Sequence, residues 1–493
     1  MLNFSRITSP SSGLHTLIVI CLAIAAGMGL VILPLDFIAL VLVLISVVLV
    51  TVITPVSAMI LLLILSPMRT LITTEAVFQF PFGLDIGQIM VLVLAGSWAV
   101  HCIVHKRPLL QFHWSPIFLT LGLFIIVTAF TVFETVAPGA WVREWLKWVF
   151  LFAMVVLTMQ IGSWRWLVFG LVLAALGNAL IGLYIFLGGS GADHLLIQGR
   201  FFRAFGTFGQ PNPFGAFMGL IAPIAIGMSL GLLARLWNAW FRTRTIHYAD
   251  MFQFVFYLFA SLVLSLGVLI SWSRGAWLGF AAALFVALVM LPRRLSYRFA
   301  VIAIIAVFAG VLFTFDLVPG AIVDRLSGVT VELFTFNDVR GVEVTTENYA
   351  LIERLAHWQS ALDMGRSDFW LGVGFGAYGE AYEGVRLLPW REPLGHAHNY
   401  YLNVFAEAGI IGLVAYLLLL FSIIVLTWLS LRHPDPLARF LVLGLLGSWV
   451  YLTIHSLTDN LYVNNLFLHL GVMIGILTIL YRQVHYGVRM RSI

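Results

Sequence analysis

The segment HAHNYYLNVFAEAG, residues 396–409, places two histidines directly before a long apolar run. An imidazole has an unperturbed pKa of about 6.5, so His398 could take a proton from a hydroxyl near neutral pH. Asn399, Asn403 and Glu407 follow at every fourth position, which places them on one face of a helix. Unpaired polar groups are costly in lipid, so this face is expected to turn toward the protein interior or a wet cavity. The segment predicts a general base at the mouth of a membrane-spanning helix.

Two other interpretations of this segment stay open. Asn399 could cap the N-terminus of a helix, with the histidines lying at the membrane interface. His396 and His398 could contribute to a metal site, but no clear further ligands accompany them in the sequence. We therefore predict a site that contains neither a metal nor another cofactor.

Two arginines lie in short connections between apolar runs. Arg203 opens RAFGTFGQPNPFGAF, residues 203–217, in which a helix is expected to begin with Asn212 as its N-cap. Arg274 occupies the tight turn SWSRGAWLGF, residues 271–280. A guanidinium keeps its charge and binds phosphate through two hydrogen bonds, and a helix start also favours anions. The pair predicts an anion site, although each arginine could instead reach toward lipid headgroups.

Two further patterns carry weaker signals. His455 and Asp459 in HSLTDN have an i,i+4 spacing that allows a hydrogen bond, and a structural pair is the preferred interpretation. Gly374, Gly376 and Gly379 in FWLGVGFGAYGEAY match the spacing of a dinucleotide fingerprint. No βαβ unit surrounds these glycines, so nucleotide binding is not predicted.

The elements that must position these residues are membrane-spanning helices. Of the 493 residues, 61% are hydrophobic and only 10% are charged, whereas soluble domains carry about 25% charged residues. Apolar runs of about 20 residues cross a bilayer as helices. The composition therefore predicts an all-α polytopic membrane protein, a bundle of about 12–14 transmembrane helices. The expected spans are 14–33, 37–54, 55–72, 86–104, 115–135, 143–161, 164–187, 213–235, 251–271, 275–291, 299–318, 402–430, 437–456 and 461–481.

The distribution of basic residues predicts which side of the membrane each loop faces. With the N-terminus inside, most Lys and Arg fall in inner loops, as the positive-inside rule requires. The net charge of +5 therefore reports topology, and nucleic-acid binding is not predicted. Arg203, Arg274 and His398 fall on the outer side. The two cysteines, Cys21 and Cys102, lie in apolar runs and are expected to be buried thiols.

Topology divides the chain into four predicted parts. Residues 1–190 hold the N-terminal transmembrane helices, and 191–318 form a transmembrane core with the outer arginine loops. Residues 319–397 form one large outer loop, and 398–493 hold the C-terminal transmembrane helices. Within the loop, NYALIERLAHWQSALDMG has apolar residues at helical spacing and predicts an amphipathic helix that lies over the bundle. Loops of this length are usually functional.

Taken in order, these segments resemble the O-antigen ligase and O-antigen polymerase superfamily of bacterial membrane glycosyltransferases. The stretch from His398 to Gly412 is similar to the ligase signature H-[NSQ]-x9-G-x-x-[GTY]. RAFGTFGQPN is similar to the R-x-x-G-T-F-x-x-P-N stretch of that superfamily, and SRGAWLG to its S-R-x-x-W/G-L segment. LGVGFGAY is similar to its large-loop pattern.

The resemblance implies transfer of a glycan from a polyprenyl-diphosphate donor to an acceptor hydroxyl, with inversion and without a metal. The site would face the outside of the bacterial inner membrane, and the acceptor glycan would be linked to a lipid, a protein or a growing polysaccharide. His398 would take the proton of the acceptor or orient its hydroxyl. Arg203 and Arg274 would hold the diphosphate and stabilise the charge of the leaving group. The expected supporting residues are Asn212, Asn399, Glu407, His455 and Asp459.

Other functions compete with this one. The sequence does not separate a ligase from a polymerase that extends the glycan. A transporter or flippase for a lipid-linked anionic solute also suits arginines that face a cavity. That function predicts broken helices in matching halves, whereas the unusual charges here fall on one side of the membrane. A structural or assembly protein would explain the spans but not the outer arginines together with His398.

Overall fold

A computed structural model describes residues 55–71 and 85–487, apart from 112–113, 190, 192, 198, 243, 246, 319, 321–322, 324–337 and 346–347. The expected spans at 14–33 and 37–54, and Cys21, lie outside the described residues. Cys102 is a buried free thiol, as predicted.

Helices make up almost all of the regular structure in the described part of the chain. The helices are α3 (Pro55–Leu65), α5 (Ile86–Val104), α6 (Pro116–Phe130), α7 (Pro138–Ile161), α8 (Trp164–Phe186), α9 (Pro211–Arg242), α10 (Tyr248–Ile270), α11 (Arg274–Met290), α12 (Leu295–Thr314), α14 (Tyr349–Ser367), α15 (Tyr378–Val385), α16 (Tyr400–Ser430), α17 (Pro436–His455) and α18 (Leu466–Tyr486). Short 3-10 turns are η1 (Ser66–Met68), η3 (Thr131–Phe133) and η4 (Asp193–Leu195). Strands β1 (Leu196–Ile197) and β2 (Phe201–Phe202) pair antiparallel.

Ten described helices are long and apolar enough to cross a membrane, and 55–71 and 274–290 are shorter apolar helices. The prediction of an all-α polytopic membrane protein is confirmed. Two starts differ most from the expected spans: α7 begins at Pro138 and not near residue 143, and α18 begins at Leu466 and not near residue 461. Asn464 and Asn465 have φ angles of 49° and 63°, a left-handed conformation in which a right-handed helix cannot continue.

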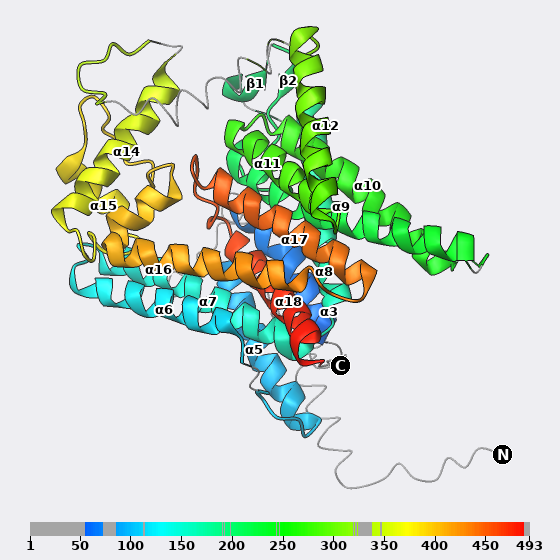
Figure 1. Cartoon of the computed structure of the whole chain (residues 1–493). Helices are drawn as coiled ribbons and strands as arrows, with labels where there is room; N and C mark the ends of the chain where they lie inside the picture. Colours follow the sequence, from blue (N-terminus) through cyan, green and yellow to red (C-terminus); the bar gives the residue numbers. More distant parts are fainter. Residues whose placement is uncertain are drawn as a thin grey trace, which may run out of the picture.

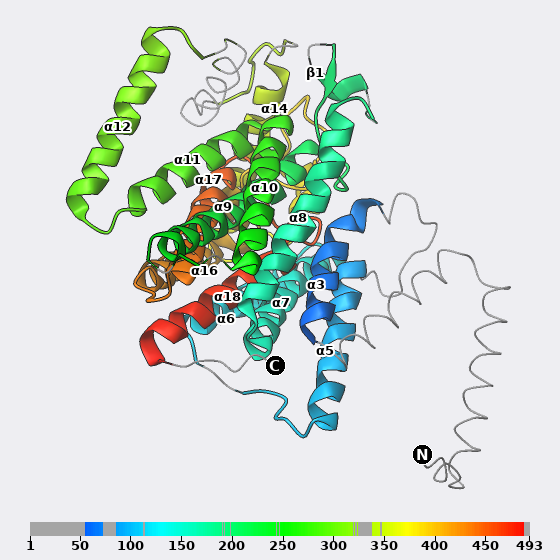
Figure 2. The same ribbon diagram turned by 90° about the vertical axis from the view of Figure 1, so that its right-hand side faces the viewer.

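Helix α9 forms the centre of the bundle and packs against α17 and α10 (Figures 1 and 2). In its most apolar stretch 83% of the residues are buried, whereas in α12 none are, and Figure 2 shows α12 standing apart from the other helices. Small residues let the α9 and α17 backbones touch. A Cβ on Gly227 would overlap the carbonyl oxygen of Phe440, and one on Gly444 would lie 2.5 Å from the carbonyl oxygen of Pro223. Such contacts are typical of helix pairs in membranes.

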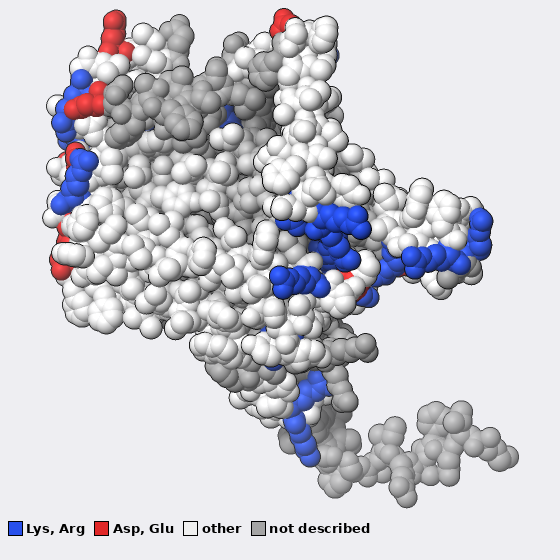
Figure 3. All heavy atoms as spheres, viewed as in Figure 1, with Lys and Arg blue, Asp and Glu red and all other residues white. Residues whose placement is uncertain are grey.

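The predicted amphipathic helix in the large loop is α14, which packs on α16 and α15 (Figure 1). Its buried face contains Leu355, Trp358, Ile352, Ala356 and His357. Charged residues are distributed differently at the two ends of the bundle. Figure 3 shows Lys and Arg gathered at the end away from α14 and α15, whereas acidic and basic residues mix beside those two helices.

Helix α16 is broken at Gly409, whose φ and ψ are 61° and −166°. Because of the break, the carbonyl oxygens of Ala406 and Glu407 accept hydrogen bonds from the large loop. The amides of Val373 and Gly374 donate to them over 2.9 and 3.1 Å. The glycine of the ligase-like signature thus binds the loop to the first turns of α16.

The glycine pattern that follows Trp370 serves close packing. Gly374 and Gly376 have φ angles of 105° and 80°, which L-residues rarely adopt. A Cβ on Gly374 would overlap Thr135, and one on Gly376 would lie 2.6 Å from the Cβ of Glu144. These contacts press the loop against the connection between α6 and α7 and against α7 itself. They account for Gly374 and Gly376 without a nucleotide, whereas a Cβ on Gly379 would meet open space.

Replacing Gly409 with alanine is expected to destabilise the protein by about 1–3 kcal/mol through the backbone conformation alone. The new Cβ would also overlap the carbonyl group of Trp370. Gly177→Ala in α8 is the matched control, because a Cβ there meets open space. Thermal unfolding in detergent should show a lower midpoint for Gly409→Ala only. Equal midpoints for both variants would mean that the break does not depend on glycine.

Candidate active site

Arg203 follows β2 and is bound to the turn between α10 and α11. Its amide donates to the carbonyl oxygen of Leu195 over 2.9 Å, and its Nε donates to that of Ser271 over 3.2 Å. Its Nη2 donates to Oδ1 of Asn212 over 3.3 Å. The N-cap prediction for Asn212 is wrong, because α9 already begins at Pro211. The Asn212 side chain orients the guanidinium instead.

Arg203 belongs to a group of three arginines. Arg274 is the first residue of α11, and Arg354 comes from α14 of the large loop. Burial, together with the charges of Arg354 and Arg274, lowers the pKa of Arg203 to about 10. The guanidinium therefore stays protonated at neutral pH. Its hydrogen bonds within the described residues go to a carbonyl and an amide oxygen, which do not neutralise it. This concentration of positive charge favours an anion.

Gly275 connects the arginine group to the histidines. A Cβ on Gly275 would overlap Oγ1 of Thr458 and lie 2.6 Å from Cδ2 of His455. Helix α11 therefore begins directly against the end of α17. Nδ1 of His455 contacts the Tyr451 hydroxyl over 2.9 Å. The predicted partner of His455, Asp459, faces two other histidines.

Asp459 lies between His396 and His398. Its Oδ1 is 3.6 Å from Nδ1 of His398 and 3.8 Å from Nε2 of His396. Burial acts to raise the pKa of Asp459, but His398, His396 and His455 outweigh it and hold the pKa below its usual range. Burial and the neighbouring His398 lower the pKa of His396 to about 3. At neutral pH the site therefore contains an ionised carboxylate and a neutral His396.

The backbone at His398 is held in an unusual conformation. Its φ is 51°, which is uncommon for a residue other than glycine. Its amide donates to Nδ1 of His396 over 3.0 Å, and the amide of Ala397 donates to Oδ1 of Asn403 over 3.1 Å. Asn399 is the N-cap of α16 and accepts from two amides of the first turn. These contacts fix the backbone at His398.

The polar residues of α16 face the protein interior, as predicted. Asn399 precedes the helix, whereas Asn403 and Glu407 are buried within it. Oε1 of Glu407 accepts from the amide of Tyr378 over 3.2 Å. Asn403 and Glu407 therefore bind two parts of the large loop, one before His398 and one at the start of α15.

Helix α14 brings His357 toward His398. Their ring centroids are 6.2 Å apart, and His357 stacks on Tyr382 of α15 at 4.7 Å. Nδ1 of His357 contacts the Tyr378 hydroxyl over 3.0 Å. Neither His357 nor Arg354 is recognisable as a site residue in the sequence, because the apolar spacing of this stretch predicts only a helix. The one signal for His357 is its place on the apolar side of an amphipathic helix.

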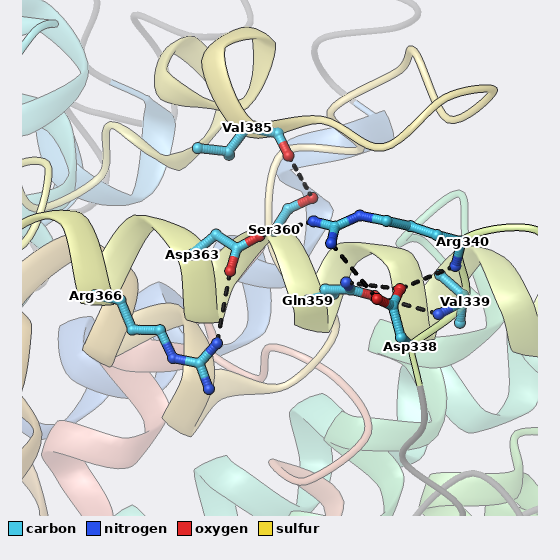
Figure 4. Close-up of polar contacts among 8 residues, drawn as sticks. All are labelled: Asp338, Val339, Arg340, Gln359, Ser360, Asp363, Arg366 and Val385. Carbon is cyan, nitrogen blue, oxygen red and sulfur yellow. Dashed lines mark hydrogen bonds and ion pairs between the residues drawn. The ribbon is translucent and has the colours of Figure 1, made fainter.

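The other face of α14 holds the loop segment that precedes this helix (Figure 4). Nε2 of Gln359 donates to Oδ1 of Asp338 over 2.9 Å. Arg340 forms ion pairs with Asp338 and Asp363 at 3.4 and 3.6 Å. These exposed pairs contribute little individually, but together they fix the loop segment against α14.

The protein is expected to lose stability as the pH falls from about 6.5 toward 4. Burial and the neighbouring His398 lower the pKa of His357 to about 4, from an ordinary value of 6.5. Between these pH values the unfolded chain binds more protons than the folded one, so acid favours unfolding. Thermal unfolding midpoints between pH 7.5 and 4 should fall less steeply in His357→Gln than in wild type or in the exposed control His194→Gln. Parallel curves for all three proteins would show that His357 is not a source of the stability loss in acid.

Residues 259–417 match a family model described as O-antigen ligase. The match begins within α10, includes Arg274, Arg354 and His398, and ends beyond Gly409 in α16. This segment of the chain is thus similar to the O-antigen ligase family. The chain is a multi-pass membrane protein, and the matched segment supports a glycan-transfer enzyme in general. No curated protein matches the chain. Arg203 and Asp459 lie outside the matched segment, and only the packing of the helices brings them to it.

Proposed function

We propose that the protein transfers a glycan from a polyprenyl-diphosphate donor to a sugar hydroxyl, with inversion. One observation carries the proposal. The arginine group and the Asp459–His398 pair meet at one end of the bundle, where Gly275 packs against His455. A fixed anion site beside a histidine is the arrangement that glycosyl transfer to a hydroxyl requires.

In this proposal Arg203 and Arg274 hold the donor diphosphate. The diphosphate gains negative charge as the bond between the anomeric carbon and the phosphate oxygen breaks. Guanidinium groups that are already in place stabilise that charge without reorganisation. The carbonyl of Ser271 and the amide of Asn212 keep the Arg203 guanidinium oriented. Arg354 adds a third cation from the loop side.

His398 acts on the acceptor. The ionised Asp459 faces its Nδ1, which favours the tautomer with the proton on Nδ1 and leaves Nε2 to accept a proton. The acceptor hydroxyl gives its proton to Nε2 while its oxygen bonds to the anomeric carbon. The diphosphate leaves with the electron pair of the broken bond. Attack opposite the leaving group inverts the anomeric carbon.

The proposed site faces the outside of the bacterial inner membrane. The basic ends of α9 and α10 lie at the opposite end of the bundle (Figure 3), and the positive-inside rule places them in the cytoplasm. The polyprenyl tail would then remain in the bilayer while the diphosphate reaches the arginines. This placement explains why polar residues stand where α16 enters the apolar layer.

The proposal is tested with purified protein in liposomes, a polyprenyl-diphosphate oligosaccharide as donor, and two acceptors. A glycan added once to a lipid-linked or protein-linked sugar identifies a ligase. A ladder of products built on the donor glycan itself identifies a polymerase. Movement of the intact donor across the bilayer without transfer would support a flippase and contradict the proposal.

Transfer is expected to survive removal of metal ions, because arginines supply the positive charge at the diphosphate. The contrary case has a structural basis, since ligand atoms of His396, His398 and Asp459 lie within 4.8 Å of one another. Activity is measured after dialysis against a chelator, together with the metal content of the protein. Activity that a chelator removes and one equivalent of zinc restores would identify these residues as a metal centre.

A further inference from the structure

An apolar groove lies between α9, α11 and α17, at the other end of the bundle from His398. Its volume is about 430 Å³, and Leu230, Leu233, Trp237, Leu291 and Phe440 line it. The groove continues toward the middle of the bundle in a narrower hollow that shares Leu230, Leu291 and Phe440. Gly227 and Gly444 border this hollow at the place where the α9 and α17 backbones touch. We call this feature the α9–α17 groove.

Arginines surround the open end of the α9–α17 groove. Arg439 lines the groove itself, and its Nη2 donates to the carbonyl oxygen of Leu291 over 2.8 Å. Arg293 and Arg298, from the turn into α12 and from α12, are near enough to repel its charge. Arg298 also lies over the Trp428 ring, 5.8 Å from its centroid. Figure 3 shows Lys and Arg side chains gathered at this end of the bundle.

These three arginines differ from others at the same end. Arg165 and Arg235 form ion pairs with Asp435 and Asp250, at 3.3 and 3.1 Å. Across the described ranges, no carboxylate forms an ion pair with Arg293, Arg298 or Arg439. Three like charges at the mouth of an apolar groove match a molecule with an anionic head and an apolar tail.

We propose that the α9–α17 groove binds an anionic phospholipid of the bilayer. An acyl chain lies along the leucines of the groove, and the headgroup phosphate contacts Arg439 with Arg293 and Arg298 beside it. Basic pockets between transmembrane helices on the cytoplasmic side are known to bind anionic headgroups. The donor lipid is a poorer occupant, because its diphosphate is assigned to the opposite end of the bundle. This choice between the two lipids rests on the proposed function.

The experiment titrates delipidated full-length protein in neutral detergent with phosphatidylglycerol or phosphatidylcholine of the same acyl composition. Bound lipid is counted by native mass spectrometry. Arg293→Gln/Arg439→Gln should weaken phosphatidylglycerol binding about ten- to thirty-fold. The control Arg242→Gln/Arg244→Gln removes two exposed charges beyond the groove and should change binding little. Ala234→Trp fills the groove with all arginines in place and should also weaken binding.

Each other outcome overturns the proposal in a distinct way. Equal binding of the two phospholipids would exclude headgroup recognition. An equal loss in the control would indicate general attraction to a basic surface. Unchanged binding in Ala234→Trp would exclude the acyl-chain site, and displacement by polyprenyl phosphate at low concentration would assign the groove to that lipid. If the double variant unfolds, Arg293→Gln is tested alone, because Arg293 is exposed. This single substitution should weaken phosphatidylglycerol binding several-fold. Unchanged binding would overturn the proposed contact between Arg293 and the headgroup.

Discussion

His398→Ala is expected to lower the rate of glycan transfer by about 10²–10⁴-fold, the usual contribution of a positioned general acid or base. The side chain of His398 is only 19% exposed and lies against the rings of His357 and His396, so its loss also removes packing. The variant should still bind donor, because the arginines are unchanged. The measurement is the transfer rate at saturating donor, with thermal unfolding as the control for folding.

Asp459→Asn provides the companion test, because it keeps the shape of the side chain and removes the charge that faces Nδ1 of His398. If Asp459 acts only by orienting His398, the two substitutions should be strongly non-additive. The double variant His398→Ala/Asp459→Asn should then be about as slow as His398→Ala alone. A double variant that loses the product of the two single effects would show that Asp459 has a separate role. Wild-type activity in His398→Ala would reduce His398 to a structural residue.

Arg203→Ala is expected to lower kcat/KM for the donor by about 10²–10³-fold, the effect of removing one group that stabilises developing charge. Arg203→Lys keeps the charge but loses the planar fork, so its activity should fall between that of alanine and wild type. Asn212→Ala should have a smaller effect of the same kind, because Asn212 only orients Arg203. Steady-state kinetics with a polyprenyl-diphosphate donor provide kcat and KM.

Arg200→Ala is the matched control for Arg203. Arg200 lies in the same connection, is exposed, and stacks on the Phe201 ring at 5.0 Å. Its removal should leave kcat/KM almost unchanged. Equal losses in Arg200→Ala and Arg203→Ala would mean that the loop attracts the donor only through its general charge. Full activity in Arg203→Lys would show that Arg203 need not bind the diphosphate through two hydrogen bonds.

The membrane architecture follows from the sequence because lipid imposes a simple requirement. A segment that crosses the bilayer must satisfy its own backbone and expose apolar side chains, so each span is visible as a run of apolar residues. The bounds of α5, Ile86–Val104, agree with the predicted span 86–104. The start of α18 could not be predicted, because the left-handed Asn464 and Asn465 interrupt an otherwise apolar run.

The candidate site follows from the sequence only in part. Arg203, Arg274 and His398 are visible as unusual residue types beside apolar runs. Their meeting depends on the packing of α11 against α17, which Gly275 and Gly279 permit. Arg354 is not visible, because one arginine within an amphipathic helix normally lies on the solvated face. Such contacts join residues separated by whole helices and leave no periodic pattern.

The most direct test of the central claim is a cryo-electron microscopy structure of the protein with a non-hydrolysable polyprenyl-diphosphate sugar. The diphosphate should lie within hydrogen-bonding distance of Arg203 and Arg274. The anomeric carbon should face the side of His398 opposite Asp459. A diphosphate bound elsewhere, with the arginines and His398 in no contact with the donor, would contradict the proposed mechanism.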